Sequence, residues 1–268
     1  MSSNIKILAW NINGGLENKL NCESFLNYLR TYDVIFLSEC WISNDFNFTS
    51  EGYVCKAIPR SKSKGIQGGG LYVMIKESYS RHISVCEVVA DTFVWIKFHG
   101  ELFNFNEDLY MCGAYLPPAN SKYHTLYDCE IFRLLEENIT SYSRKGKICL
   151  VGDLNCRTAN IPDFIENDSV HNSLQNQLSN IFEYSVDENM TERNNPDIEL
   201  NDYGSKLIKL CKSTGLLNGR HSGGYSKDFT YCGPKSLSVL DYFLISYDLF
   251  KLIDKFIVTN FNQFSAFM

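Results

Sequence analysis

The sequence lacks the cysteine patterns that brace small proteins. Ten cysteines occur among 268 residues, but there is no Cys-x-x-Cys pair and no histidine at zinc-ligand spacing. Scattered cysteines of this kind are typical of small buried hydrophobic residues in a reducing compartment. Because 44% of the residues are hydrophobic and 14% are aromatic, the chain can bury a large core without disulfides or structural zinc.

Long apolar runs are also missing. No run approaches the roughly 20 residues that a membrane-spanning helix needs. The polar segment from Met1 to Lys6 shows no secretory signal. We therefore expect a soluble intracellular protein with no membrane partner, and the nucleus is among the locations that fit.

An excess of positive charge is absent, because 25 Lys and Arg stand against 31 Asp and Glu, for a formal net charge of −6. Domains that coat nucleic acid by bulk attraction are usually strongly basic, so the composition argues against that class. It does not exclude a phosphodiesterase. Such enzymes concentrate carboxylates around a metal, and the metal and a few local cations contact the phosphates.

Short runs rich in β-branched and aromatic residues recur and predict extensive sheet. The predicted strands are Ile5–Trp10, Val34–Leu37, Leu71–Ile75, Ile83–Val89, Phe93–Phe98, Leu109–Tyr115, Ile148–Val151 and Asp241–Ile245. Helical periodicity covers Leu16–Arg30, Leu126–Tyr142 and Tyr203–Thr214. Too few helices separate the strands for a simple βαβ repeat, so we expect an α/β fold with mixed sheets and helices packed outside.

The whole chain, residues 1–268, is predicted to form one domain. Residues 158–201 differ in composition from the rest, because they are rich in Asn, Asp, Glu and Ser and carry only isolated apolar residues. A polar stretch of this length between a strand and a helix predicts a long loop insertion.

Polar residues follow hydrophobic strands at four places, where a rigid strand end can open to a cleft. Asn11 lies in a turn-forming Asn-Gly context, Glu39 can be a solvated strand end, and Tyr115 precedes two prolines that terminate a strand. The fourth place is the most specific, because Asp153 and Asn155 lie two positions apart and face the same side of an extended chain.

In this order, the motifs WNINGG, SECW, AYLPPANS, GDLNCR and SVLDYFLIS resemble the endonuclease/exonuclease/phosphatase superfamily, from about Ile5 to about Thr259. The endonuclease domains of non-LTR, LINE-type retrotransposons are most similar, through features such as Arg157 after the GDLN run. The resemblance implies a four-layer sandwich of two packed mixed sheets flanked by helices. It also implies a Mg²⁺-dependent phosphodiester hydrolase that nicks target DNA, with a reverse transcriptase domain expected in an intact element but absent from this sequence.

The resemblance implies a role for each matched residue. Glu39 would be the principal Mg²⁺ ligand, with Mn²⁺ as an alternative ion, and Asn11 would assist at the metal or the phosphate. Asp153 would orient or deprotonate the attacking water, and Asn155 would hold that water and a phosphate oxygen. The Tyr115 hydroxyl would hydrogen-bond the scissile phosphate.

The match breaks down at the last motif. Asp241 corresponds to an Asp that orients a histidine from a terminal Ser-Asp-His motif, but Ser265 is followed by Ala266 and Phe267. None of the five histidines, which are His82, His99, His124, His171 and His221, lies at that place. His221 follows an Asn-Gly-Arg turn, where an ordinary loop residue is a better interpretation than a substitute for the missing histidine. Since losing such a group typically costs about 10²–10³ in rate, we expect impaired activity from a missing or degenerate catalytic strand. A catalytically inactive retroelement remnant and a repair-type nuclease or phosphatase of the same fold remain alternatives.

Local basic groups would contact the DNA. Arg60, Lys62 and Lys64 precede a glycine-rich run in which backbone and side chains can approach phosphates, although a charged β-turn explains them equally well. Arg157 and Arg220 are further candidates.

Overall fold

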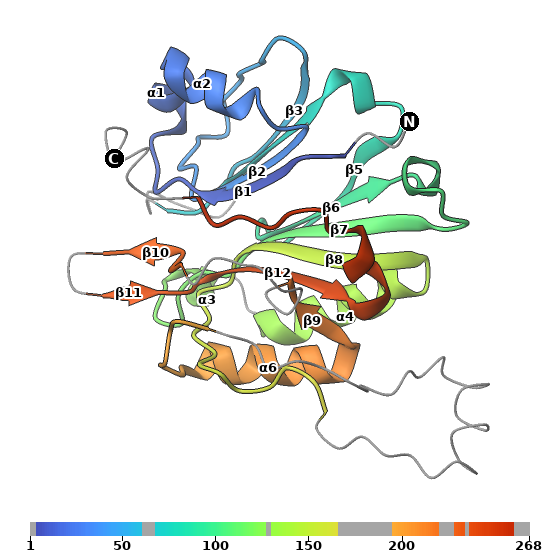
Figure 1. Ribbon diagram of the computed structural model, residues 1–268. Helices are drawn as coiled ribbons and strands as arrows, with labels where there is room; N and C mark the ends of the chain where they lie inside the picture. The colour runs from blue at the N-terminus through green and yellow to red at the C-terminus, as the bar shows by residue number, and fades with distance from the viewer. Residues whose placement is uncertain are drawn as a thin grey trace.

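The computed structural model describes residues 4–60, 68–126, 130–165, 195–219, 228–233 and 236–259. Within these residues, two mixed sheets pack against each other (Figure 1). The smaller sheet has the order β1-β2-β4-β3 and contains β1 (Ile7–Asn11), β2 (Val34–Ser38), β3 (Tyr53–Ile58) and β4 (Leu71–Lys76). Strands β1 and β2 are parallel, whereas β4 runs antiparallel to β2 and β3.

The larger sheet has the order β5-β6-β7-β8-β12-β9. Its strands are β5 (Ile83–Val89), β6 (Phe93–Phe98), β7 (Asp108–Tyr115), β8 (Gly146–Asp153), β9 (Leu216–Asn218) and β12 (Asp241–Ser246). Strands β5, β6 and β7 form the predicted antiparallel meander, and β7 and β8 are parallel. A separate antiparallel pair joins β10 (Tyr231–Cys232) to β11 (Leu237–Ser238).

Helices cover the outer face of each sheet, which completes four layers (Figure 1). Helices α1 (Leu16–Leu20) and α2 (Glu23–Leu29) pack on the smaller sheet. Helices α3 (Tyr123–Leu126), α4 (Ile131–Ser143) and α6 (Asp202–Thr214) lie on the larger one. Short 3₁₀ turns occupy Glu77–Tyr79, Gly100–Phe103 and Tyr247–Leu252. The predicted α/β four-layer sandwich is therefore confirmed.

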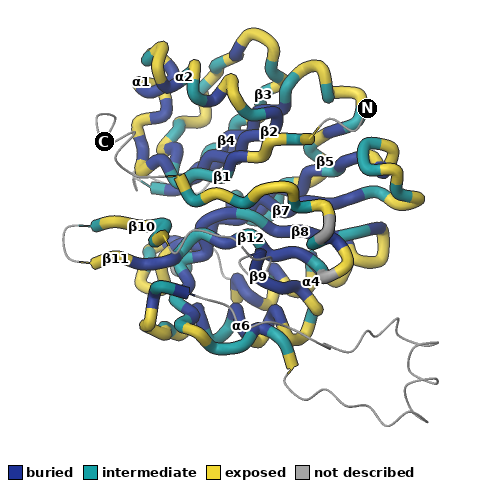
Figure 2. Tube along the Cα trace, in the orientation of Figure 1, coloured by how far each residue is buried: buried dark blue, intermediate teal, exposed yellow. Residues whose placement is uncertain are grey.

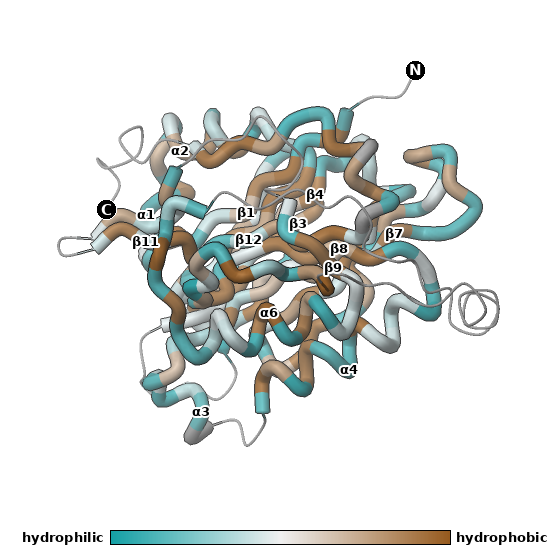
Figure 3. The backbone as a smooth tube through the Cα atoms, turned by 60° about the horizontal axis from the view of Figure 1, so that its bottom comes forward, coloured by the Kyte–Doolittle hydropathy of each residue, from teal (hydrophilic) through white to brown (hydrophobic). Residues whose placement is uncertain are grey.

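Burial follows the hydrophobic pattern of the sequence. The strands are buried between the layers while loops and outer helix turns are exposed (Figure 2). Hydrophobic residues concentrate along the central strands, and α4 and α6 alternate between hydrophobic and hydrophilic residues (Figure 3). This alternation is expected for helices that bury one face. None of the helices in the described ranges combines the length and apolar character needed to cross a membrane.

Two predicted helices differ from the structure. The helix predicted over Leu16–Arg30 is two helices, because Cys22 has extended backbone angles and interrupts the turn pattern. This break lets both short helices bury apolar residues against the same sheet. The helix predicted from Leu126 begins at Ile131 instead, where the Glu130 side chain accepts a hydrogen bond from the Arg133 backbone N–H at 2.8 Å and caps the first turn.

Only the ends of the predicted loop insertion, residues 158–201, can be described. Thr158 forms an antiparallel bridge with Leu200, and the Asn201 backbone N–H donates to the Arg157 carbonyl at 3.0 Å. Residues 166–194, which make up most of the predicted loop, lie outside the described residues.

Candidate active site

Strand ends bring the predicted site residues to one edge of the sandwich. In the larger sheet, Tyr115 at the end of β7 is paired with Asp153 at the end of β8, and Asp153 is paired with Asp241 at the start of β12. In the smaller sheet, Asn11 ends β1 beside Ser38, the residue before Glu39. These ends lie on the side of the molecule where β10 and β11 project (Figure 1).

Two side-chain hydrogen bonds join the sheets at this edge. Asn11 Nδ2 donates to Asp153 Oδ2 at 2.7 Å, and the Tyr115 hydroxyl donates to Glu39 Oε1. Each bond links residues that lie far apart in the sequence and on different sheets. The structure therefore brings Asn11, Glu39, Tyr115, Asp153 and Asp241 together at one site.

Glu39 is held rigidly by its surroundings. Its carboxylate Oε2 accepts hydrogen bonds from Trp41 Nε1 at 2.6 Å and from the Gly69 backbone N–H at 2.7 Å, in addition to the Tyr115 contact at Oε1. Its backbone φ is +53°. A non-glycine residue in this region costs about 1–3 kcal/mol and persists where the surrounding structure fixes it, commonly at functional sites.

Trp41 is a site residue to which the sequence analysis assigned no role. Its indole is 45% exposed although its N–H binds the Glu39 carboxylate. The ring lies directly against Gly14, where an added Cβ would come within 2.2 Å of a ring carbon. Any larger residue at position 14 would collide with the Trp41 ring. The Asn-Gly-Gly run after β1 is therefore needed for packing against Trp41 as well as for the turn.

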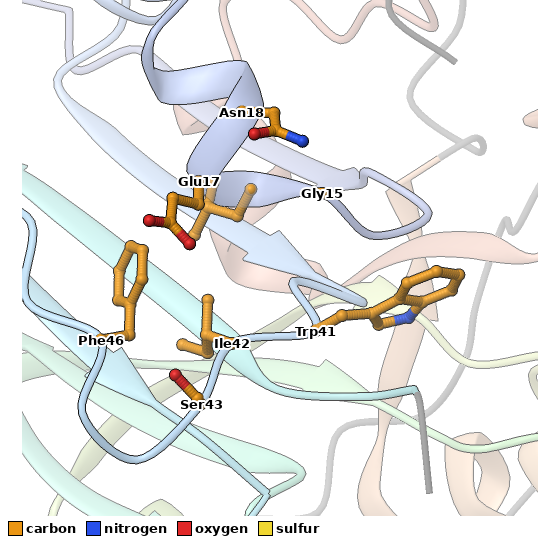
Figure 4. Close-up of a pocket in the computed structure, with 8 residues that line it drawn as sticks. Gly15, Glu17, Asn18, Trp41, Ile42, Ser43 and Phe46 are labelled. Carbon is orange, nitrogen blue, oxygen red and sulfur yellow. The ribbon is translucent and has the colours of Figure 1, made fainter.

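A shallow pocket opens beside Trp41. It measures about 190 Å³ and is lined by Gly15, Leu16, Glu17, Asn18, Trp41, Ile42, Ser43 and Phe46. Figure 4 shows the Trp41 indole extending away from the Glu17 and Phe46 side of this pocket. The pocket lies next to the strand-end site rather than over the carboxylates.

Asp153 carries a buried carboxylate at this edge. It is only 4% exposed, and its Oδ1 accepts a hydrogen bond from the Asn155 backbone N–H at 2.9 Å. Burial, followed by repulsion from Asp241, holds the pKa of Asp153 well above its usual range, and Glu39 adds to the effect. The Asn155 side chain donates to the Leu116 carbonyl at 2.8 Å, so it fixes the chain that follows β8.

Lys19 supports the turn between β1 and α1. Its buried ammonium donates to the carbonyls of Ile12 and Gly14, the latter at 2.8 Å, and burial lowers the pKa of Lys19. Nothing in the sequence identified these partners of Lys19. Lys19 therefore positions the turn that carries Asn11 and supports Trp41.

The predicted DNA contacts fall into three groups. Arg60 is buried close to Glu39. Arg157 forms two hydrogen bonds with Asp197, at 2.7 and 2.8 Å, and an ion pair with Glu199, so its charge is already balanced. Lys62, Lys64 and Arg220 lie outside the described residues.

Two of the described histidines, His82 and His99, lie away from this carboxylate cluster. His99 follows the end of β6 that is opposite the Tyr115 edge, and His82 packs edge-to-face against it. His124 contacts the Tyr203 hydroxyl at 2.9 Å. His171, His221 and the segment with Ser265, Ala266 and Phe267 lie outside the described residues.

The donor set fits a hard divalent cation. Mg²⁺ is usually bound through one or two carboxylates, keeps several waters and does not require an all-protein cage. In the described residues no three His, Cys, Asp or Glu side chains form such a cage. Glu39 and Asp153 offer carboxylate oxygens whose hydrogen-bond donors, among the described residues, are all uncharged. A cation there would balance their negative charge.

Comparison with known proteins identifies the fold. No protein-family model and no curated protein matches the sequence. Among solved structures, a 3′-5′ exonuclease from Neisseria meningitidis shares 17% identity over 92% of this chain and 89% of its own, with a TM-score of 0.54. The endonuclease domain of a telomere-specific non-LTR retrotransposon shares 13% identity over 94% and 89% of the two chains, also with a TM-score of 0.54.

A third similar structure is a 3′ phosphatase from Neisseria bound to a product DNA hairpin. It shares 18% identity over 92% of this chain and 88% of its own, with a TM-score of 0.52. The predicted resemblance is thus confirmed at the level of the fold, which is that of the endonuclease/exonuclease/phosphatase proteins. The roles of individual residues remain predictions.

Proposed function

We propose that this chain is a Mg²⁺-dependent phosphodiester hydrolase that nicks DNA in the manner of a retrotransposon endonuclease. The observation that carries the proposal is the pair of cross-sheet hydrogen bonds, Asn11 to Asp153 and Tyr115 to Glu39. They place carboxylates, an amide and a phenol in one site on a fold shared with DNA-processing enzymes. Mn²⁺ suits the same oxygen donors.

The metal site in this proposal is built on Glu39, with Asn11 assisting. A bound Mg²⁺ would neutralise charge on the phosphate and polarise its oxygens. Glu39 is suited to hold the ion because its three hydrogen bonds fix the carboxylate before any ligand arrives. Because the Glu39 carboxylate is already fixed in position, it loses little conformational entropy when it binds a metal ion.

The remaining residues act on the water and the phosphate. Asp153 accepts a proton from the attacking water, and its raised pKa makes it a better proton acceptor than an ordinary carboxylate. The Tyr115 hydroxyl turns from Glu39 to a phosphate oxygen and donates a hydrogen bond there. Asn155 keeps Asp153 in place through its backbone N–H. Asp241 sustains the raised pKa of Asp153 by repulsion.

Weak activity is part of the proposal. Ala266 and Phe267 stand where the resemblance places an Asp and a His. Without that histidine one stabilising contact to the transition-state phosphate is lost, while the residues above remain. DNA is the proposed substrate, and a reverse transcriptase domain is the proposed partner in an intact element.

A second candidate function is hydrolysis at the 3′ end of DNA, because the similar structures include a 3′-5′ exonuclease and a 3′ phosphatase. The two functions differ in where they act. Nicking converts supercoiled plasmid to open circles, whereas a 3′ phosphatase releases inorganic phosphate from a 3′-phosphorylated oligonucleotide. Assaying both substrates with the same enzyme preparation distinguishes them.

The test of the proposal replaces Glu39 by Gln. We expect Glu39→Gln to abolish plasmid nicking in Mg²⁺ and to remove the rise in melting temperature that Mg²⁺ gives the wild type. Glu87→Gln is the matched control, because Glu87 also accepts a hydrogen bond from a tyrosine, Tyr142, but on the outer face of the larger sheet. Nicking that survives Glu39→Gln undiminished would rule out this mechanism.

A further inference from the structure

Arg60 is a buried cation that forms no ion pair with any residue that the structure describes. It follows β3 by two residues and is 6% exposed, and its Nε has no hydrogen-bond partner among the described residues. The guanidinium lies over the Tyr123 ring, 5.2 Å from its centre. A cation–π contact offsets only part of the cost of burying a charge, and buried charges are normally paired. Arg157, by contrast, is paired with two carboxylates.

Arg60 and Glu39 both border Gly68. A Cβ added to Gly68 would lie 3.7 Å from Glu39 Oε2 and 3.9 Å from Arg60 Nη1, with no other contact within 4 Å. A Cβ on Gly69 would collide with the guanidinium at 2.2 Å. Glu39 takes its hydrogen bonds from Tyr115, Trp41 and Gly69 rather than from Arg60. The two opposite charges therefore lie on either side of the backbone at Gly68 and are not joined by a hydrogen bond.

We propose that Arg60 forms a phosphate-binding subsite beside Glu39 and holds an oxygen of the scissile phosphate. This inference rests on the proposed function. The guanidinium is a planar fork that matches two phosphate oxygens. A phosphodiester has two non-bridging oxygens, so one can accept hydrogen bonds from Arg60 while the other contacts a cation held by Glu39. Arg60 is thus a catalytic residue that contacts the reacting phosphate, rather than an exposed contact to flanking DNA.

The subsite can be tested without any catalysis. Inorganic phosphate is titrated into metal-free protein with a chelator present, while the melting temperature and the arginine Nε–H resonances are recorded. We expect phosphate to raise the melting temperature of the wild type saturably and to shift one buried arginine resonance. Arg60→Met, which keeps an apolar chain for Tyr123, should weaken phosphate binding roughly 10-fold to 100-fold, as expected for losing hydrogen bonds to a charged group.

Two further variants separate phosphate binding from simple packing. Arg30→Met removes the same charge from an exposed arginine that pairs with Glu23 before β2, at the opposite edge, and should leave phosphate binding unchanged. Arg60→Lys retains the charge without the fork and should bind phosphate at an intermediate strength. If Arg60→Met is too unstable to purify, weaker binding by Arg60→Lys supports the subsite and wild-type binding overturns it.

Gly68→Ala tests the position between Glu39 and Arg60 directly. Its φ is +122°, so the new side chain strains the backbone and also enters the space between Glu39 and Arg60. Gly52→Ala is the matched control, because Gly52 has φ +78° and nothing within 4 Å of the added Cβ. We expect both variants to lose stability but only Gly68→Ala to lose phosphate affinity.

Equal phosphate binding by the wild type and Arg60→Met would overturn the subsite, whatever the nuclease assays show. Phosphate binding that depends on Arg60 in a protein that never nicks DNA would instead retain the subsite and remove the proposed function. On supercoiled DNA, Arg60→Met should lower the nicking rate by about 10²–10³, the usual effect of losing one electrostatic contact to the reacting group.

Discussion

Removing the Tyr115 hydroxyl distinguishes a catalytic role from a structural one, because the two roles predict different effects on activity and on stability. The side chain is 2% exposed, and its hydroxyl donates to Glu39 Oε1. Tyr115→Phe removes that oxygen and keeps the ring, so no cavity larger than a hydroxyl results. Glu39 retains its donors from Trp41 and Gly69. The structural cost is therefore one hydrogen bond to a charged group, about 1.5–3 kcal/mol of unfolding free energy.

The expected effect on activity is larger than the structural change suggests. If the hydroxyl turns to the scissile phosphate, Tyr115→Phe removes a contact that strengthens as charge develops in the transition state. Such contacts are worth about 10²–10³ in kcat, or about 2.7–4 kcal/mol of barrier. Substrate affinity should change much less, because the ground-state phosphate has other partners.

Tyr142→Phe is the matched control for this substitution. The Tyr142 hydroxyl donates to Glu87 Oε2 at 2.7 Å, and the residue is 4% exposed on the outer face of the larger sheet. Both variants should lose similar stability in denaturant titrations, while only Tyr115→Phe should slow conversion of supercoiled plasmid under single-turnover conditions. Equal nicking rates for the two variants would refute a catalytic role for Tyr115.

Two further predictions concern protonation and the terminal motif. Because burial and then repulsion from Asp241 raise the pKa of Asp153, the folded protein holds this proton more tightly than the unfolded chain. The contribution of Asp153 to stability therefore falls as pH rises from its ordinary pKa through the raised one. Asp153→Asn should flatten that slope in melts from about pH 4 to about pH 8 with a chelator, and an unchanged slope would contradict the burial argument. Replacing Ala266 by Asp together with Phe267 by His should speed nicking at least about tenfold, and an unchanged rate would show that another defect is limiting.

The strands were predictable where the sequence pattern was strong. All eight predicted strands are present within a few residues, because each is a dense run of β-branched and aromatic residues. Strand β3 was missed, since it is an edge strand with a half-exposed pattern and Lys56 in its middle. Strand β9 has only three residues, too few to show a period. The break at Cys22 was missed because apolar residues continue at helical spacing on both sides of it.

The candidate site was only partly predictable, for a different reason. Asn11, Glu39, Tyr115 and Asp153 could be proposed because each follows or ends a strand, which fixes its edge of the sheet. Which of them pair across the sheets depends on tertiary packing that no local pattern encodes. The same holds for Arg157, which resembled a DNA contact in sequence but pairs with Asp197, 40 residues away.

Backbone strain and unbalanced charge occur together at this edge. Asn13, Glu39, Trp41 and Asn155 all have φ between +49° and +53°, a region that costs free energy for non-glycine residues. In the part of the chain that the structure describes, the carboxylates of Glu39 and Asp153 receive only uncharged donors, and Arg60 forms no hydrogen bond with either of them. A site arranged for stability alone would pair Arg60 with Glu39 and relax the backbone. The strained backbone and the unpaired charges are both explained if a cation and a phosphate bind here. The cation then pairs with the carboxylates, and the phosphate pairs with Arg60.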